Sequence, residues 1–130
     1  MLTSSTFLSR ALLLDAIATG AAALLLLAAA GSLAGVLGLP APLLRYAGLL
    51  LVPFVVLVGW AGTRERAPRQ AVRTIIGANA LWVIASVLLL LSGWVQPSAL
   101  GYAFVIGQAI VVGIFAELQM IGLRRAPAHG

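Results

Sequence analysis

Four long apolar runs, separated by short polar segments, set the pattern of this chain. They cover residues 11–36, 44–62, 71–93 and 99–123. Each run is continuous, without the alternation of a half-buried strand, and each is long enough to cross a hydrocarbon core of about 30 Å as a helix. A helix also satisfies its own backbone hydrogen bonds inside lipid. The pattern therefore predicts an all-α membrane protein, a four-transmembrane-helix bundle that forms one domain over residues 1–130.

Arginines gather at one end of these predicted spans and indicate the orientation of the chain. One side of the membrane would carry only Arg45, and the other would carry Arg10, Arg64, Arg66, Arg69, Arg73, Arg124 and Arg125. Because basic residues are retained on the cytoplasmic side, we expect both termini in the cytoplasm. The absence of lysine and the abundance of Ala, Gly, Pro and Leu are typical of a GC-rich bacterial genome, so we expect the bacterial inner membrane.

The first run has superficial features of a signal peptide. Arg10 precedes an apolar stretch, and Ala28-Ala29-Ala30 lies near its end. The run is longer than the apolar region of a signal peptide, and Asp15 interrupts it. We therefore expect it to remain in the protein as the first span.

The two predicted hairpins have related sequences, which suggests parallel repeats over residues 9–62 and 70–124. Gly38 and Pro42 have the same spacing as Gly93 and Pro97, and each pair follows a predicted helix. Repeats with the same orientation would be related by an axis along the membrane normal. The alternative is that apolar hairpins composed mainly of Ala, Leu and Gly have similar sequences by chance.

Three polar residues within the spans fall at similar depths from the arginine-rich side. Asp15 lies five residues from Arg10, Asn79 lies six from Arg73, and Glu117 lies seven from Arg124. These separations correspond to about 7–11 Å along a helix. Because charged groups rarely face acyl chains, we expect all three to point into the bundle as one polar layer. With neighbours on the same helical faces, the candidate set for a polar cavity or a proton- or ligand-binding site is Asp15, Thr19, Asn79, Trp82, Ser86 and Glu117.

Two interpretations of this polar layer remain open. In the functional one, the residues line a small cavity open to the cytoplasm, and Asp15 and Glu117 bind protons. In the structural one, each carboxylate pairs with an arginine, and the pairs fix helix register. The candidate partners are Arg10, Arg73 and Arg124, with Arg73 favoured.

Other polar residues suggest contacts outside the bundle. Gln108 and Gln119 share a face of the last run, nearly opposite Glu117, and this face could contact a second protomer or another subunit. The arginines of the middle loop could bind anionic lipid headgroups, although a topology anchor alone also explains them. The candidate headgroup ligands are Arg64, Arg66 and Arg69.

The composition excludes several classes of function. The chain has no cysteine and one histidine, His129, which lies in a polar tail. We therefore expect no metal site and no cofactor. Catalytic motifs are missing, and the net charge of +5 follows from membrane topology and predicts no nucleic-acid binding.

We therefore expect a non-enzymatic membrane protein, either an interaction subunit or a binder of lipid-like small molecules. It would contact membrane lipids and could form a homo-dimer or a larger membrane complex. The alternative is a small proton-coupled transporter that acts as a dimer.

Four short segments carry a resemblance to known proteins. They are Asn79-Ala80-Leu81-Trp82-Val83-Ile84-Ala85-Ser86, Ala99-Leu100-Gly101-Tyr102, Gln108-Ala109 and Gly122-Leu123-Arg124-Arg125. In them the chain resembles small, uncharacterised bacterial four-helix membrane proteins, which implies the fold and no activity. Small multidrug-resistance transporters are similar in architecture alone. Asp15 would correspond to the carboxylate of their first helix, but that carboxylate is a glutamate and the surrounding pattern is absent here.

Overall fold

Four helices, each a candidate membrane span, make up the described part of the chain. The computed structural model describes residues 2–64 and 67–125, with side chains from residue 6 onward. The helices are α1 (Leu2–Leu37), α2 (Ala41–Thr63), α3 (Arg69–Ser92) and α4 (Ala99–Arg125), and the described residues form no strand. All four are long and apolar enough to cross a membrane. The predicted all-α bundle of four helices, each a candidate membrane span, is confirmed. Apart from the longer start of α1, each helix starts and ends within a few residues of its predicted run.

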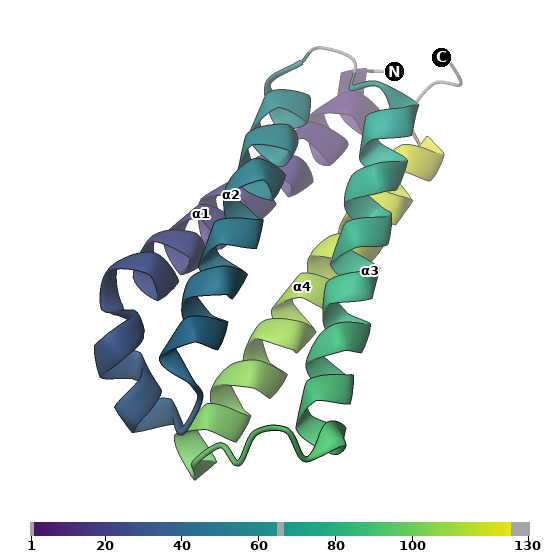
Figure 1. Ribbon diagram of the computed structural model, residues 1–130. Helices are drawn as coiled ribbons and strands as arrows, with labels where there is room; N and C mark the ends of the chain where they lie inside the picture. The colour runs from purple at the N-terminus through teal and green to yellow at the C-terminus, as the bar shows by residue number, and fades with distance from the viewer. Residues whose placement is uncertain (1, 65–66, 126–130) are drawn as a thin grey trace.

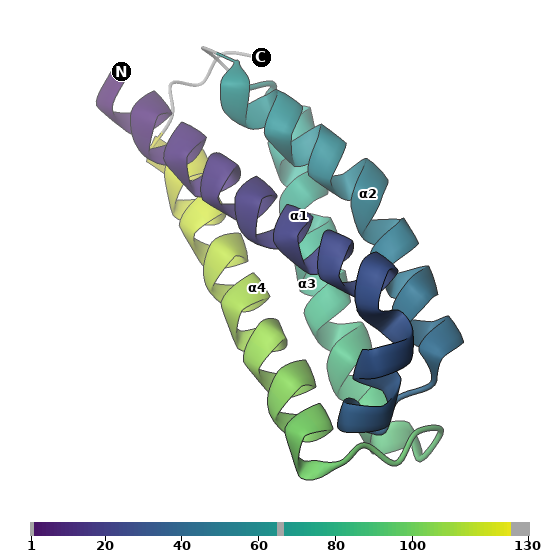
Figure 2. The same ribbon diagram turned by 90° about the vertical axis from the view of Figure 1, so that its left-hand side faces the viewer.

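The helices form a ring in the order α1, α2, α3 and α4. In Figure 2, α1 lies in front, between α4 and α2, with α3 behind. Of the neighbouring pairs, α1 and α2 contact each other most and α2 and α3 least. Figure 1 shows α4 through the space between α2 and α3. The ring therefore has one loose side, which lies between the two hairpins.

The start of α1, the end of α2, the start of α3 and the end of α4 lie at one end of the bundle (Figure 1). We call it the arginine-rich end, because its described arginines are Arg10, Arg64, Arg69, Arg73, Arg124 and Arg125. Clustering of these arginines agrees with the expected topology. The cytoplasmic orientation of both termini and the type of membrane stay predictions.

The opposite end is closed by two turns that are joined to each other. Gly38 and Gly93 end α1 and α3 with positive φ angles of 69° and 79°, a conformation that glycine adopts without steric cost. Ser98 caps α4, since its Oγ accepts a hydrogen bond from the Gly101 N–H at 3.1 Å. The Ser98 N–H in turn donates to the Leu37 carbonyl at 2.9 Å. These bonds tie the first hairpin to the second.

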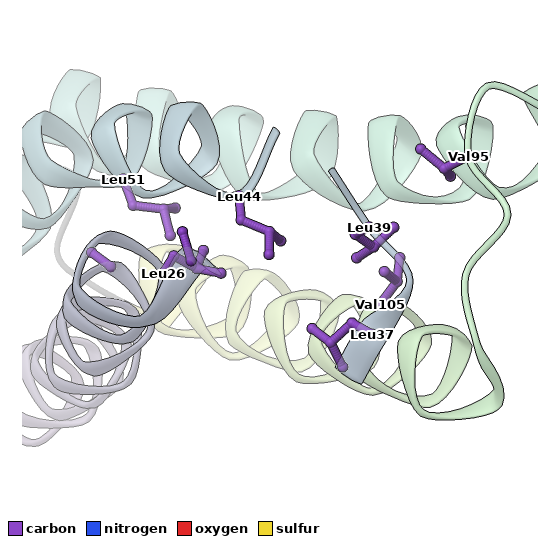
Figure 3. Close-up of a cluster of buried hydrophobic side chains, with 9 residues drawn as sticks. Leu26, Leu37, Leu39, Leu44, Leu51, Val95 and Val105 are labelled. Atoms are coloured by element: carbon purple, nitrogen blue, oxygen red, sulfur yellow. The ribbon is translucent and has the colours of Figure 1, made fainter. Parts of the chain in front are cut away.

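Two apolar clusters fill the space between the helices. One lies toward the turns and includes Leu26, Leu44 and Val105 (Figure 3). The other lies toward the arginine-rich end and includes Leu12 and Ile75. The outer surface is also apolar, with large exposed side chains such as Leu24, Leu50, Val56, Leu88, Leu91 and Ile110. An apolar exterior suits acyl chains as solvent, and it agrees with the membrane assignment.

The proposed repeat of residues 9–62 and 70–124 stays a prediction. Gly38 and Gly93, which we aligned from their spacing, do take up the same left-handed conformation at corresponding helix ends. That similarity is local and concerns two turns.

Candidate functional site

A buried carboxylate near the arginine-rich end is surrounded by neutral hydrogen-bond donors. Asp15 of α1 has no exposed surface. Its Oδ1 accepts a hydrogen bond from Thr19 Oγ1 at 2.8 Å. Its Oδ2 accepts two more, from Asn79 Nδ2 at 3.0 Å and from Gln119 Nε2 at 2.7 Å. Asp15 therefore accepts three hydrogen bonds, the pattern suited to an ionised carboxylate.

This cluster joins three helices. Asn79 of α3 also donates from Nδ2 to Gln119 Oε1 of α4, at 3.0 Å. Asp15, Asn79 and Gln119 are all buried, and together with Thr19 we call them the carboxylate cluster. Hydrogen bonds to a charged group contribute about 1.5–3 kcal/mol each when one partner is removed. The cluster is therefore expected to fix the relative register of α1, α3 and α4.

A second polar cluster lies one to two helical turns further along α3. Trp82 Nε1 donates to Gln108 Oε1 at 2.7 Å. Gln108 Nε2 donates to Ser86 Oγ at 2.9 Å and to the Val105 carbonyl at 2.8 Å. Ser86 Oγ closes the cluster by donating to the Trp82 carbonyl at 2.7 Å. We call Trp82, Ser86 and Gln108 the indole cluster.

A cleft of about 720 Å³ lies beside both clusters, on the loose side of the ring. All four helices contribute to its lining, which is mostly apolar. The polar exceptions are Thr19, Asn79, Trp82 and Gln108. Leu50 of α2 and Leu81 of α3 lie at its margin and are largely exposed. The cleft therefore opens between α2 and α3, toward the space that lipid occupies around a membrane-spanning bundle.

The expectation that Glu117 points into the bundle is wrong. Glu117 is exposed and lies on an outer groove between α3 and α4 of about 400 Å³. Gln119 takes the inward position instead, because residues two positions apart on a helix point in nearly opposite directions. Physically, an inward Glu117 would bring a second negative charge toward Asp15, whereas the Gln119 amide supplies a hydrogen-bond donor.

The expected oligomer face of α4 is wrong for the same reason. Gln119 is fully buried and Gln108 is half-buried, and both bond to residues of the same bundle. Sequence reasoning placed these two residues correctly on one face, opposite Glu117. The error was to place the face of Glu117 inside the bundle and the face of Gln108 and Gln119 outside it.

The expected ion pairs with arginine are also wrong for Asp15. Within the described part of the chain, the donors to its carboxylate are Thr19, Asn79 and Gln119, which are neutral. Arg73, the favoured partner, is exposed, and so are Arg10 and Arg124. An arginine on the outer surface keeps its charge hydrated near the membrane boundary, while amides satisfy the buried carboxylate.

The arginines proposed as lipid-headgroup ligands have different surroundings. Arg64 lies 5.4 Å from the centre of the Trp60 ring. Arg69 Nη1 donates to the Leu123 carbonyl at 3.2 Å, and so satisfies a carbonyl near the end of α4. Arg66 lies outside the described residues. Headgroup binding by these arginines stays a prediction.

One observable signal in the sequence could have identified Gln119 and Gln108 as inward-facing. Their spacing of 11 residues is about three helical turns, so they share one face of α4, while Asn79 and Ser86, seven residues or about two turns apart, share one face of α3. Complementary amides at matched depths on neighbouring helices are the pattern of interhelical hydrogen bonds in membranes.

Comparisons with known proteins identify no relative from which a role for the cleft could be taken. No protein-family model, curated protein or solved structure matches this chain. The four candidate spans indicate a multi-pass membrane protein, and no family is identified for it.

Proposed function

We propose that this chain is a non-enzymatic membrane protein that binds a small amphipathic, lipid-like molecule in the cleft between α2 and α3. The observation that carries the proposal is the cleft itself, with a volume of about 720 Å³ and an apolar lining broken by four polar side chains. Small-molecule sites have volumes of about 300–1,000 Å³ and combine apolar walls with a few placed polar groups.

The shape of the bundle favours entry from the bilayer. The cleft lies along the pair of helices with the fewest mutual contacts. Asn79 lies 10 residues after the start of α3, which corresponds to about 15 Å along the helix axis. A molecule in the cleft would therefore sit at mid-height, with its apolar part against side chains such as Phe54 and Phe115.

The site also suits binding better than catalysis. The polar residues of the cleft are an alcohol, two amides and an indole, and the neighbouring carboxylate of Asp15 has no exposed surface. A general acid or base must come within hydrogen-bond reach of the reacting group. Amides and a hydroxyl can orient a ligand, so binding is the activity that these residues support.

Native mass spectrometry of the protein released from a mild detergent tests the proposal. The wild-type protein should retain a bound small molecule. Gly107→Phe should lose it, because Gly107 lines the cleft and a Cβ added there meets no atom within 4 Å, so the ring can enter the cleft without displacing backbone. Gly77→Phe is the matched control, since Gly77 is equally unobstructed but lies outside the cleft lining. A bare wild-type protein, or equal retention by all three proteins, would overturn the proposal.

A second candidate function is a small proton-coupled transporter, and it rests on Asp15 alone. This carboxylate is buried and is hydrogen-bonded to Thr19 and Asn79, which also line the cleft. Protonation of Asp15 would therefore alter two walls of the ligand site directly. If the chain is such a transporter, Asp15→Asn should remove the pH dependence of ligand binding or flux and leave the folded protein intact. Unchanged pH dependence in the variant would exclude this function.

A further inference from the structure

We infer that the ligand of the cleft is a hydrogen-bond donor with a positive charge, an apolar chain that ends in a primary ammonium group. This inference rests on the proposed function and specifies its ligand class. It follows from the hydrogen bonds that the polar side chains of the lining already make within the protein. Each of these side chains donates all of its polar hydrogens to another protein group.

The residues of the carboxylate cluster donate inward. Thr19 has one hydroxyl hydrogen, which it donates to Asp15 Oδ1. Asn79 has two amide hydrogens, and Nδ2 donates to Asp15 Oδ2 and to Gln119 Oε1. Since both groups that receive the Asn79 hydrogens are acceptors, the amide nitrogen of Asn79 must face them. Its Oδ1 must then face the other way.

The residues of the indole cluster also donate to the protein. The indole of Trp82 has one N–H and no acceptor, and this N–H bonds to Gln108 Oε1. A donor-only partner fixes the orientation of the Gln108 amide, whose two hydrogens go to Ser86 and to the Val105 carbonyl. Neither Trp82 nor Gln108 therefore has a hydrogen left for a ligand.

The groups left for a ligand are acceptors. No described residue donates to Asn79 Oδ1, yet no buried side-chain nitrogen or oxygen among the described residues lacks a hydrogen-bond partner. Asn79 Oδ1 is therefore not fully buried, and Asn79 lines the cleft. Thr19 Oγ1 and Gln108 Oε1 each keep accepting capacity as well. A ligand that can only accept hydrogen bonds finds no partner on this wall.

Charge favours a cationic donor over a neutral one. The Asp15 carboxylate lies directly behind Thr19 and Asn79, at hydrogen-bond distance from both. Its described donors are all neutral, so its negative charge is not cancelled locally. In a low-dielectric interior such a charge attracts a cation and repels an anion more strongly than it would in water. A primary ammonium group supplies the charge and three N–H donors together.

Quenching of Trp82 fluorescence by terminally brominated dodecyl chains tests the inference. Trp82 lines the cleft, whereas Trp60 and Trp94 are exposed on the outer surface and are replaced by phenylalanine in the protein used. Four head groups are compared in neutral micelles: primary ammonium, alcohol, trimethylammonium and carboxylate. Gly107→Phe in the same background measures quenching that does not come from the cleft.

The primary ammonium chain should bind about tenfold more tightly than the trimethylammonium chain, which has the same charge and no donor, because a charge-assisted hydrogen bond is worth about this factor. The alcohol should fall between the primary ammonium and the carboxylate. In an Asp15→Asn protein the preference for ammonium over alcohol should disappear, while binding of the alcohol should persist and so show that the cleft is still folded.

The outcomes separate this inference from the proposed function. If no head group gives quenching that Gly107→Phe removes, the proposed function fails. If the four chains bind equally well, or if the carboxylate binds best, the cleft is a binding site but the inferred ligand class is wrong. If trimethylammonium equals primary ammonium, charge alone selects the ligand and the donor argument fails.

Discussion

Replacement of Gln119 by methionine tests the role of the carboxylate cluster in stability. Gln119 is fully buried and makes two side-chain bonds, a donated bond to Asp15 and an accepted bond from Asn79. Methionine has a similar length and flexibility, so Gln119→Met removes both bonds with little change in packed volume. The variant therefore isolates hydrogen bonding from cavity formation.

The structure sets the expected size of the effect. A hydrogen bond to a charged group contributes about 1.5–3 kcal/mol and a neutral one about 0.5–1.5 kcal/mol. Loss of one of each gives about 3 kcal/mol. Interhelical hydrogen bonds in membranes average only about 0.6 kcal/mol, so two ordinary bonds would give about 1 kcal/mol. A loss well above that value indicates that Asp15 is left buried with too few donors.

The free energy of unfolding is measured by denaturant titration in mixed micelles, followed by tryptophan fluorescence. Gln70→Met is the matched control, because Gln70 is exposed at the start of α3 and should change stability by no more than about 0.5 kcal/mol. The pair is then repeated in an Asp15→Asn background. There the cost of Gln119→Met should fall by about 1–2 kcal/mol, because a neutral amide needs its donors less than a carboxylate does. An equal cost in both backgrounds, or a cost no larger than that of the control, would refute the reasoning.

Two further predictions concern the ends of the bundle. Gly101→Ala should destabilise the protein by about 1–3 kcal/mol, because a Cβ there would overlap the Leu37 carbonyl, whereas Gly77→Ala, with open space around it, should be neutral or stabilising in the same unfolding titration. Because the chain has no cysteine, single-cysteine variants report its orientation. In intact cells a membrane-impermeant maleimide should label Gln96→Cys and should not label Gln70→Cys. The reverse pattern would contradict the expected cytoplasmic termini.

The number and position of the helices could be predicted because the bilayer sets both the length and the composition of a span. The meeting of Asp15 with Asn79 was also predictable, since both lie at similar depths and a carboxylate needs a donor. The rotation of α4 was predicted wrongly, since Glu117 is exposed and Gln119 is buried. Its inner and outer faces are both apolar, so the choice between Glu117 and Gln119 depends on the charges contributed by the other helices.

The cleft could not be predicted from the sequence either, because it depends on which glycines lie at helix contacts. In α2, Gly48 and Gly62 allow α1 to approach closely, since a Cβ at either position would come within 2.9 Å of a leucine side chain of α1. In α4, Gly107 lines the cleft and has nothing within 4 Å of its Cβ position. Glycines that look alike in the sequence therefore lie at a close helix contact in one place and beside open space in another.

The carboxylate cluster also has a consequence for the biogenesis of the protein. Asp15 leaves the ribosome 64 residues before Asn79 and 104 residues before Gln119. Thr19, one turn away on the same helix, is the donor that accompanies Asp15 from the start. During membrane insertion the first helix therefore carries an incompletely satisfied carboxylate until the third and fourth helices arrive. A chain interrupted after its second helix would expose this group, and such an exposed charge is a physical basis on which a cell can distinguish an unfinished bundle from a complete one.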